Sequence, residues 1–335
     1  MYHIGAKTFL EVNQKKMTKS PMQHNLSEHK KALQCRSQRI HQRDWIINHK
    51  RRSYSTNLKP TRSSSIHHQN SKSEFKFGHQ LKSMRKDAPL SNQVEDIPKF
   101  VNDLNLEWNS FQTVLNTIFR FRKLLSRDPQ HPPVTQVIDS GAVPYFVQLL
   151  NPTHIEQYCQ IKKTNDESTD PSKANVISLH KLHALQYEVS WCISNIVGGG
   201  TSDHVKYIVE TGCVPLLVNL LESKHSKVRS QSIWVVGNIA GDSEAMRSYL
   251  IELGAMKHLV NLVETDPEIK NKRDGKCDAN PVYNMIVLVA VWSIANFFRG
   301  KKTPEKCGLI TDTIPLLCQL ILNHEMDEEL LLNTW

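Results

Sequence analysis

The sequence predicts an all-α solenoid of stacked helical repeats, and two periodicities in its second half support this prediction. The first is a Trp followed four residues later by an Asn, a spacing that places both side chains on one face of a helix. Successive Trp residues lie 43, 58 and 43 positions apart, so the unit is about 43 residues with one insertion. Periods of about 40 to 47 residues are typical of two- or three-helix solenoid repeats. The positions are Trp191 with Asn195, Trp234 with Asn238, Trp292 with Asn296, and Trp335 at the end of the sequence.

A glycine recurs in the same way ahead of each Trp helix. Gly141, Gly212 and Gly254 each stand two residues after an acidic residue and just before an apolar run. A glycine at such a place is expected to end a short first helix. Pro144 and Pro215 suit the first position of a second helix, because proline is favoured there. The third helix of each unit then carries the Trp and the Asn.

These periods divide the chain into three parts. We expect a disordered basic arm over residues 1–71, a short basic helix over 72–90 and repeats over 91–335. The individual repeats are expected at about 96–128, 133–200, 201–241 and 243–300, with a partial repeat at 303–335. Insertions at about 151–180 and 265–281 fall between the second and third helices of their repeats, where polar loops are tolerated. The second insertion is basic and is interpreted as a solvated loop, with competition for an acidic groove as the alternative.

Composition argues against several functional classes. The longest apolar run, residues 285–292, is far shorter than the roughly 20 residues that a membrane span needs. Residues 1–10 contain no apolar segment long enough for a secretory signal. The seven cysteines are scattered without a Cys-x-x-Cys pair, which favours free thiols in a reducing compartment. No phosphate loop, metal-ligand spacing or nucleophile motif occurs, so we expect no enzyme, no cofactor, no metal and no membrane partner.

Charge is concentrated at the N-terminal side. Residues 1–100 contain 20 Lys and Arg against 7 Asp and Glu, a net charge of +13, whereas residues 101–335 carry a net charge of −4. Residues 1–71 are also rich in polar side chains and lack sustained periodicity, which predicts disorder. An arm of this kind is a solvated segment or a weak attractor of nucleic acid. In the second case, affinity would fall steeply with salt and disappear with the arm.

One stretch of the arm has helical spacing. Phe77, Leu81 and Met84 lie at i, i+4 and i+7 within residues 74–87, and the segment ends before Pro89. Basic side chains surround this apolar stripe, so the segment predicts a basic amphipathic helix. Such a helix suits a membrane surface, a calmodulin-type receptor or an acidic protein partner. The basic residues are Lys76, Lys82, Arg85 and Lys86.

The Trp and Asn ladder predicts a groove for extended peptides. Equivalent helices of a solenoid stack about 8–10 Å apart, and an extended chain advances about 3.3 Å per residue, so a peptide would meet a new Asn roughly every three residues. A carboxamide can bond a peptide N–H and C=O without reading its side chain. Neighbouring indoles would form slots for Lys or Arg stems, each contact contributing about 0.5–2 kcal/mol. A single Trp at helical spacing is more often a core residue than a binding residue. Three Trp residues at the same position of successive repeats indicate a groove.

Residues 185–196, 231–242 and 291–299 resemble the importin-α, or karyopherin-α, family, most specifically through Trp-x-x-Gly-Asn-Ile-Ala-Gly-Asp. Residues 121–127 look like the first repeat of that family, with Arg122 and Ser126 in the Trp and Asn phases. The resemblance covers about residues 72 to 335. It implies a right-handed armadillo-repeat superhelix that shuttles between cytoplasm and nucleus as an import adaptor. Its implied partners are cargo proteins with nuclear localisation signals and importin-β, without direct nucleic-acid binding.

The resemblance also implies roles for individual residues. Asp242 matches the carboxylate that pairs with the key lysine of a signal, and Gly199 or Gly200 matches the glycine whose carbonyl faces that lysine. The helix around Lys82 resembles the importin-β-binding helix. The predicted peptide-binding residues are Trp191, Asn195, Gly199, Gly200, Gln231, Trp234, Asn238, Asp242, Trp292, Asn296, Arg299 and Trp335. The predicted importin-β-binding residues are Lys76, Lys82, Arg85 and Lys86.

The sequence departs from the family at two groove positions. Val205 stands where the family has a Thr that helps to hold the same lysine, and Ser230 stands where a Glu is common. Losing these polar groups would weaken lysine binding by on the order of 1 kcal/mol each. An armadillo scaffold with different cargo is therefore the alternative function. The sequence also stops inside its fifth expected repeat, so the minor signal site and the exportin docking region of the family are expected to be absent from it.

Overall fold

The computed structural model describes residues 93–128, 131–162, 176–265 and 281–299. All of the described residues belong to one compact unit of the chain. The predicted arm, the predicted basic helix and the partial repeat at 303–335 lie outside them. Trp335 and the four predicted importin-β-binding residues therefore have no structural description.

The described chain is almost entirely helical, as the sequence predicts. After a 3-10 turn, η1 (Val94–Asp96), come α4 (Ile97–Asn102) and α5 (Phe111–Arg127). The next elements are α6 (Val134–Asp139), α7 (Ala142–Leu150), α8 (Pro152–Tyr158), β1 (Gln160–Lys162), β2 (Val176–Ser178) and α9 (Leu179–Gly199). They are followed by α10 (Ser202–Glu210), α11 (Cys213–Leu220) and α12 (Ser226–Asp242), and then by α13 (Glu244–Glu252), α14 (Ala255–Thr265) and α16 (Pro281–Phe297).

A left-handed glycine joins the first and second helices of successive units. Gly141, Gly212 and Gly254 have φ of 77°, 78° and 79° and stand between α6 and α7, α10 and α11, and α13 and α14. This confirms the role that the sequence predicts for the glycines. The predicted position of the prolines is wrong by two residues, because Pro144 and Pro215 are the third residues of α7 and α11. Proline is tolerated there since the first four helical N–H groups lack intrahelical partners.

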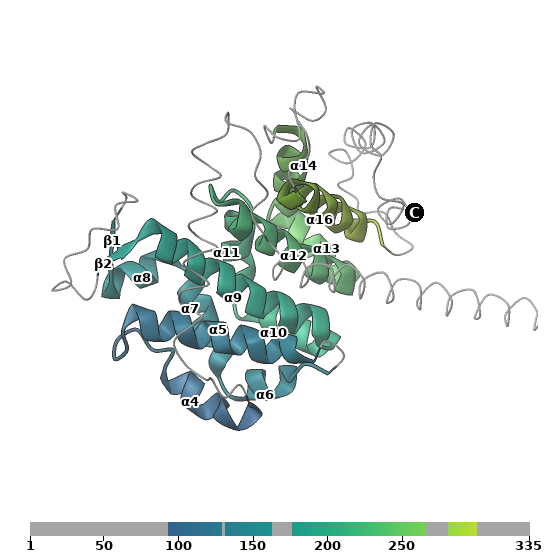
Figure 1. The fold of residues 1–335 in the computed structure, drawn as a ribbon. Helices are drawn as coiled ribbons and strands as arrows, with labels where there is room; N and C mark the ends of the chain where they lie inside the picture. Colours follow the sequence, from purple (N-terminus) through teal and green to yellow (C-terminus); the bar gives the residue numbers. More distant parts are fainter. Residues whose placement is uncertain (1–92, 129–130, 163–175, 266–280, 300–335) are drawn as a thin grey trace, which may run out of the picture. The chain divides into compact units, whose positions relative to one another are not determined.

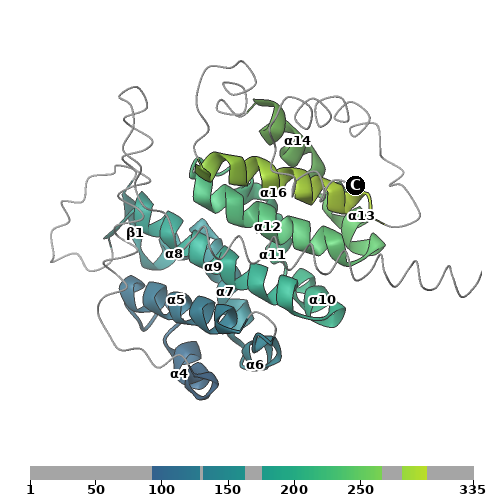
Figure 2. The same cartoon turned by 45° about the vertical axis from the view of Figure 1, so that its right-hand side comes forward.

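The third helices of successive units lie side by side. Figures 1 and 2 show α5, α9, α12 and α16 in this order, and each packs against the next. Polar residues start two of them: Ser110 Oγ accepts a hydrogen bond from the Thr113 N–H at 3.1 Å before α5, and Ser178 caps α9. The second helices α7, α11 and α14 pack against α9, α12 and α16 of their own units. This arrangement is an armadillo-type solenoid.

The core follows from this stacking. α9 packs against α5, α7 and α12, and it is buried on nearly all sides from Ala184 to Val197. At the N-terminal end, the rings of Phe100, Phe121 and Phe146 form an edge-to-face chain with centroid separations of 5.5 and 5.3 Å. Within the described residues, no helix combines the length and the apolar character that a bilayer crossing requires.

The first insertion is more ordered than the predicted polar loop. It contains α8 and a parallel pair of strands, in which Gln160 is paired with Val176 and Lys162 with Ser178. Ile155 and Cys159 are 0% and 5% exposed, so the insertion is anchored in the core by apolar residues that a loop would not need. The strand pair is also the exception to an all-α fold. Residues 163–175 and 266–280 of the two insertions lie outside the described part.

The glycine corner gives a stability prediction. At Gly212, an added Cβ would meet no atom within 4 Å, so an Ala there would suffer from backbone strain alone. We expect Gly212→Ala to lower the free energy of unfolding by about 1–2 kcal/mol, because φ near 78° is unfavourable for an L-residue. Gly212→Asn is the matched control and should lose less, since Asn enters the left-handed region more readily. Denaturant unfolding measures both, and equal losses would contradict a backbone origin.

Two neighbouring histidines are shielded from solvent between α9 and α12. The ring centroids of His183 in α9 and His225 before α12 are 5.1 Å apart. Burial lowers the pKa of His183 to about 4, with a contribution from the charge of His180. Burial also lowers the pKa of His225 to about 3, and the charges of His183, Lys227, His180 and Arg229 act in the same direction.

These shifts predict a loss of stability at mildly acidic pH. The unfolded chain binds protons at His183 and His225 near the ordinary pKa of 6.5, whereas the folded chain resists protonation down to about pH 4 and 3. Stability should therefore fall as the pH drops from about 6.5 towards 4. Thermal unfolding across this range would measure the slope. The double variant His183→Gln/His225→Gln should show a flatter dependence, and an unchanged slope would assign the effect to other groups.

Candidate functional site

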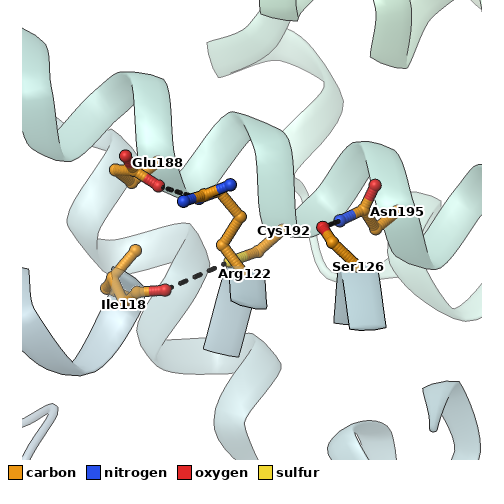
Figure 3. A network of polar contacts seen from close by, with 6 residues as sticks. All are labelled: Ile118, Arg122, Ser126, Glu188, Cys192 and Asn195. Atoms are coloured by element: carbon orange, nitrogen blue, oxygen red, sulfur yellow. Dashed lines mark hydrogen bonds and ion pairs between the residues drawn. The ribbon is translucent and has the colours of Figure 1, made fainter. Parts of the chain in front are cut away.

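Each Asn of the ladder is anchored to the preceding third helix through its amide nitrogen. The bonds run from Asn195 Nδ2 to Ser126 Oγ at 2.8 Å (Figure 3), from Asn238 Nδ2 to the Ser194 carbonyl at 3.4 Å, and from Asn296 Nδ2 to the Gly237 carbonyl at 2.8 Å. One N–H of each carboxamide therefore holds neighbouring repeats together. The sequence predicted only peptide contacts for these side chains, because no local pattern reveals a bond between residues 44 to 69 positions apart.

Two acceptors on this face remain without donors. Asn296 Oδ1 and Gln231 Oε1 accept no hydrogen bond from the described residues, although the two residues are only 0% and 3% exposed. A buried acceptor without a donor costs about 1–3 kcal/mol. Both residues are in the predicted peptide-binding set. Asn238 is half-buried, so its carboxamide is the most accessible of the three.

The indoles do not form the open slots that the sequence suggested. Trp191, Trp234 and Trp292 are only 2%, 1% and 2% exposed. The rings of Trp234 and Trp292 touch, with centroids 5.0 Å apart and planes tilted by 49°. An aliphatic stem between two rings needs carbon contacts of about 3.5–4.0 Å on each side, which is roughly 7 Å in total. In this arrangement, a lysine stem cannot enter between Trp234 and Trp292.

A glycine allows this close contact between α12 and α16. A Cβ on Gly237 would overlap with Ser293 Oγ and with the ring of Trp292. The Gly of the Trp-x-x-Gly-Asn motif is therefore required by the neighbouring repeat. Its absent side chain lets Ser293 Oγ donate to the Ile233 carbonyl at 2.9 Å and lets Asn296 reach the Gly237 carbonyl.

A buried ion pair lies between α5 and α9, and this contact between two successive third helices is called the α5–α9 step of the ladder. Arg122 Nε pairs with the carboxylate of Glu188, whose side chain is 0% exposed (Figure 3). The guanidinium carbon of Arg122 lies 4.3 Å from the centroid of the Trp191 ring and 4.8 Å from that of Phe119. The sequence places Arg122 in the Trp phase of the first repeat, and the structure adds that it lies against the Trp of the next one.

The cysteines of the described chain are core thiols. Cys159, Cys192 and Cys213 are free and buried, as the sequence suggests for several cysteines. Burial raises the pKa of each thiol, to about 11 for Cys213 and well above the usual range for Cys192. Cys192 Sγ donates to the Ile118 carbonyl at 3.6 Å (Figure 3). These protonated thiols are poor nucleophiles and act through packing.

An acidic position lies at the C-terminal end of α12. Asp242 is half-buried, and its Oδ1 accepts a hydrogen bond from Ser202 Oγ at 2.7 Å. Sequence reasoning missed Ser202; it noted only that Val205 lacks the expected hydroxyl, and Val205 is 2% exposed. Arg299 approaches the same end of α12, because its Nη1 would lie 3.1 Å from a Cβ on Gly241.

The glycines at the end of α9 have structural roles of their own. Gly199 is the last residue of α9, and a Cβ there would overlap with the ring of Pro132. Gly200 caps the helix in an extended conformation, and its N–H donates to the Ile196 carbonyl at 2.8 Å. The structure therefore explains both glycines by close packing. A contact from either carbonyl to a bound lysine stays a prediction.

Comparisons with known proteins agree with this geometry. The family model of the armadillo/β-catenin-like repeat matches residues 201–241. Importin subunit alpha-2 of Arabidopsis thaliana is 30% identical over 244 residues, and importin subunit alpha-1b of Oryza sativa subsp. japonica is 31% identical over 244 residues. Each match covers 73% of this chain and 36% of the relative. The chain is an armadillo-repeat protein with sequence similarity to importin-α subunits. It thus spans about a third of the length of these importin-α relatives.

A solved structure supports the fold of this importin-α relative. A computationally designed armadillo repeat protein for modular peptide recognition superposes with a TM-score of 0.51 and 18% sequence identity, covering 79% of this chain and 94% of the designed one. At this identity, the likeness concerns the fold alone.

The close contact between α12 and α16 predicts that replacing a helical Gly with Ala lowers the free energy of unfolding, which is the opposite of the usual effect. Ala normally stabilises a helix interior by about 1 kcal/mol relative to Gly. We expect Gly237→Ala to destabilise this importin-α relative by about 1–3 kcal/mol instead, because the new methyl group overpacks against Trp292 and Ser293. Gly198→Ala in α9 is the control, since its Cβ would meet only the end of the Asn238 side chain, at 3.0 Å. Urea unfolding of both variants decides, and stabilisation by Gly237→Ala would contradict the close packing.

Proposed function

We propose that this importin-α relative is a nuclear import adaptor that binds lysine- and arginine-rich localisation signals along the face of α9, α12 and α16. The observation that carries the proposal is the ladder of Asn195, Asn238 and Asn296, whose amide groups are fixed to the preceding helix at each step. Adaptors of this kind move between cytoplasm and nucleus. The proposal gives no direct role to nucleic acid, a membrane, a metal or a cofactor.

The fixed carboxamides suit an extended peptide backbone. A carboxamide has two N–H groups and an acceptor oxygen, so an Asn that is held through Nδ2 can also bond a peptide main chain. Asn296 Oδ1 and Gln231 Oε1 are buried acceptors without donors among the described residues, so a peptide N–H could reach them and remove a desolvation cost only after the face opens. Such contacts hold the peptide without reading its sequence.

The preference for a basic signal comes from Asp242. Its carboxylate is half-buried at the end of α12, and α9 ends nearby at Gly199. The C-terminal ends of helices carry partial negative charge, which favours a cation. Ser202 orients Asp242 through the 2.7 Å hydrogen bond and supplies the hydroxyl that Val205 lacks. A lysine ammonium at Asp242 would make a charge-assisted contact in a partly dehydrated site.

Peptide binding then requires a change at the indoles. Trp234 and Trp292 are in contact, so a lysine stem can pass between them only if the rings separate. Rotation of an indole would leave the Asn anchors of α12 and α16 in place, because these bonds lie outside the rings. Binding should accordingly alter tryptophan fluorescence.

Carrier binding is assigned to the predicted helix at 72–90. Its basic residues Lys76, Lys82, Arg85 and Lys86 would contact importin-β. Deletion of residues 72–90 should abolish co-purification with importin-β and leave signal binding intact. Retention of importin-β by the deletion variant would contradict this assignment.

The proposed function predicts how a signal peptide binds to the full-length chain. A fluorescent peptide with four consecutive lysines should bind with micromolar or tighter affinity. Asn238→Ala should weaken binding about 3- to 10-fold, as expected for the loss of a net hydrogen bond of about 0.5–1.5 kcal/mol. Asp242→Lys should weaken it more than tenfold, because it replaces attraction with repulsion. Fluorescence anisotropy titration measures all three affinities.

Matched substitutions control for general effects of charge and folding. Asn219→Ala in α11 and Glu252→Lys at the end of α13 alter exposed residues of the same types. Both should bind the peptide like the unmodified chain. Equal weakening by Glu252→Lys and Asp242→Lys would mean that overall charge, and not the α12 site, attracts the peptide.

The closed contact of Trp234 and Trp292 favours a second candidate, an armadillo scaffold with different cargo. In that case, the ladder supports the fold, and other surfaces bind the partner. Absence of binding to lysine-rich peptides by the folded chain would support this function over the first.

A further inference from the structure

We infer that the α5–α9 step contains a guanidinium-binding site that the chain fills with its own Arg122, and that Arg122 thereby excludes a ligand arginine from the face of Trp191. The existence of this site follows from the described residues alone. Its effect on where a basic peptide begins to bind rests on the proposed function.

Two aromatic rings and a carboxylate converge on Arg122. Trp191 offers a ring face at 4.3 Å, Phe119 offers another at 4.8 Å, and Glu188 offers a carboxylate to Nε. A guanidinium is planar and weakly hydrated, so it can stack on an aromatic ring and pair with a carboxylate at the same time. An ammonium ion is more strongly hydrated and fits this set less well. The site therefore selects arginine over lysine.

The site is buried, and Arg122 is needed to balance the charge of Glu188 inside it. The side chain of Glu188 is 0% exposed and that of Arg122 is 9% exposed. Neither carboxylate oxygen of Glu188 accepts a hydrogen bond from a described residue, so Arg122 is the described group that balances its charge. Without Arg122, a buried carboxylate would face an aromatic surface and an empty space the size of an arginine side chain.

One helical turn further along α5 and α9, the polar side chains also bond to each other within the chain. Ser126, one turn after Arg122 in α5, accepts the hydrogen bond of Asn195 at 2.8 Å (Figure 3). Both ladder positions of α9 thus meet side chains from α5. By contrast, Gln231 and Asn296 have acceptors without donors in the described part of the chain, and Asp242 is half-buried. A bound basic peptide should therefore engage the α12–α16 steps and end its arginine contacts before Trp191.

Chemical rescue tests the site without any peptide. Arg122→Ala should lower the melting temperature of the full-length chain, and millimolar ethylguanidinium chloride should restore part of that loss. Ethylammonium chloride at the same ionic strength should restore much less. The unmodified chain and the double variant Arg122→Met/Glu188→Met should show no such selective gain. Equal shifts in all three proteins, or no gain for Arg122→Ala with ethylguanidinium, would overturn the inference.

The guanidinium site can still be tested if Arg122→Ala has a severe folding defect. If that variant is unfolded in plain buffer, ethylguanidinium should recover its helical circular dichroism, and ethylammonium should not. Failure of ethylguanidinium to recover helical signal at any non-denaturing concentration would contradict a guanidinium site. The double variant shows whether an apolar pair at these two positions still folds.

A second measurement separates this inference from the proposed function. Arg122→Ala should bind an arginine-rich peptide about tenfold more tightly than the unmodified chain does, because the face of Trp191 becomes available for a cation–π contact with the peptide. A lysine-rich peptide should gain much less. If ethylguanidinium rescues stability while neither protein binds any basic peptide, the Arg122 site stands and the import function fails. If the unmodified chain binds basic peptides but ethylguanidinium does not rescue Arg122→Ala, the import function stands and the Arg122 site fails.

Discussion

Close lateral packing of successive third helices is the constraint on which this structure depends. α9 has α5 on one side and α12 on the other, and α12 packs in turn against α16. Polar groups on these buried faces need partners in the neighbouring helix, since water cannot reach them. The Asn residues supply such partners, because each donates a hydrogen bond from Nδ2 to the preceding third helix. Gly237 keeps α12 and α16 close enough for the last of these bonds.

Stacking and recognition therefore compete for the same side chains. At the α5–α9 step, Arg122, Ser126 and Asn195 are all engaged within the chain. Towards α12 and α16, Gln231 and Asn296 have acceptors for which the described residues supply no donor. The face is thus not a uniform row of equal subsites, although its sequence motif repeats. A ligand that opens this face would find unused acceptors at the C-terminal part of the described array.

Periodicity predicted the repeated units and the glycines that end their first helices, because helical spacing fixes which residues share a face. The phase of Arg122 came from the resemblance to the first repeat of the importin-α family. It could not predict the distance between two faces, and so the contact of Trp234 with Trp292 was missed. The Ser202 bond to Asp242 joins helices 40 residues apart and leaves no local signal. The strands at Gln160 and Val176 were missed because a predominantly polar insertion conceals a few apolar anchors.

The most direct test of the account is an NMR titration of the full-length chain with selectively 15N-labelled asparagine and an unlabelled lysine-rich peptide. Assignments would come from single Asn→Gln substitutions. The account predicts that the side-chain amide signals of Asn238 and Asn296 shift on binding, whereas those of Asn219 on exposed α11 do not. Saturable peptide binding that leaves Asn238 and Asn296 unchanged would contradict it, because the ladder would then be a stacking device alone.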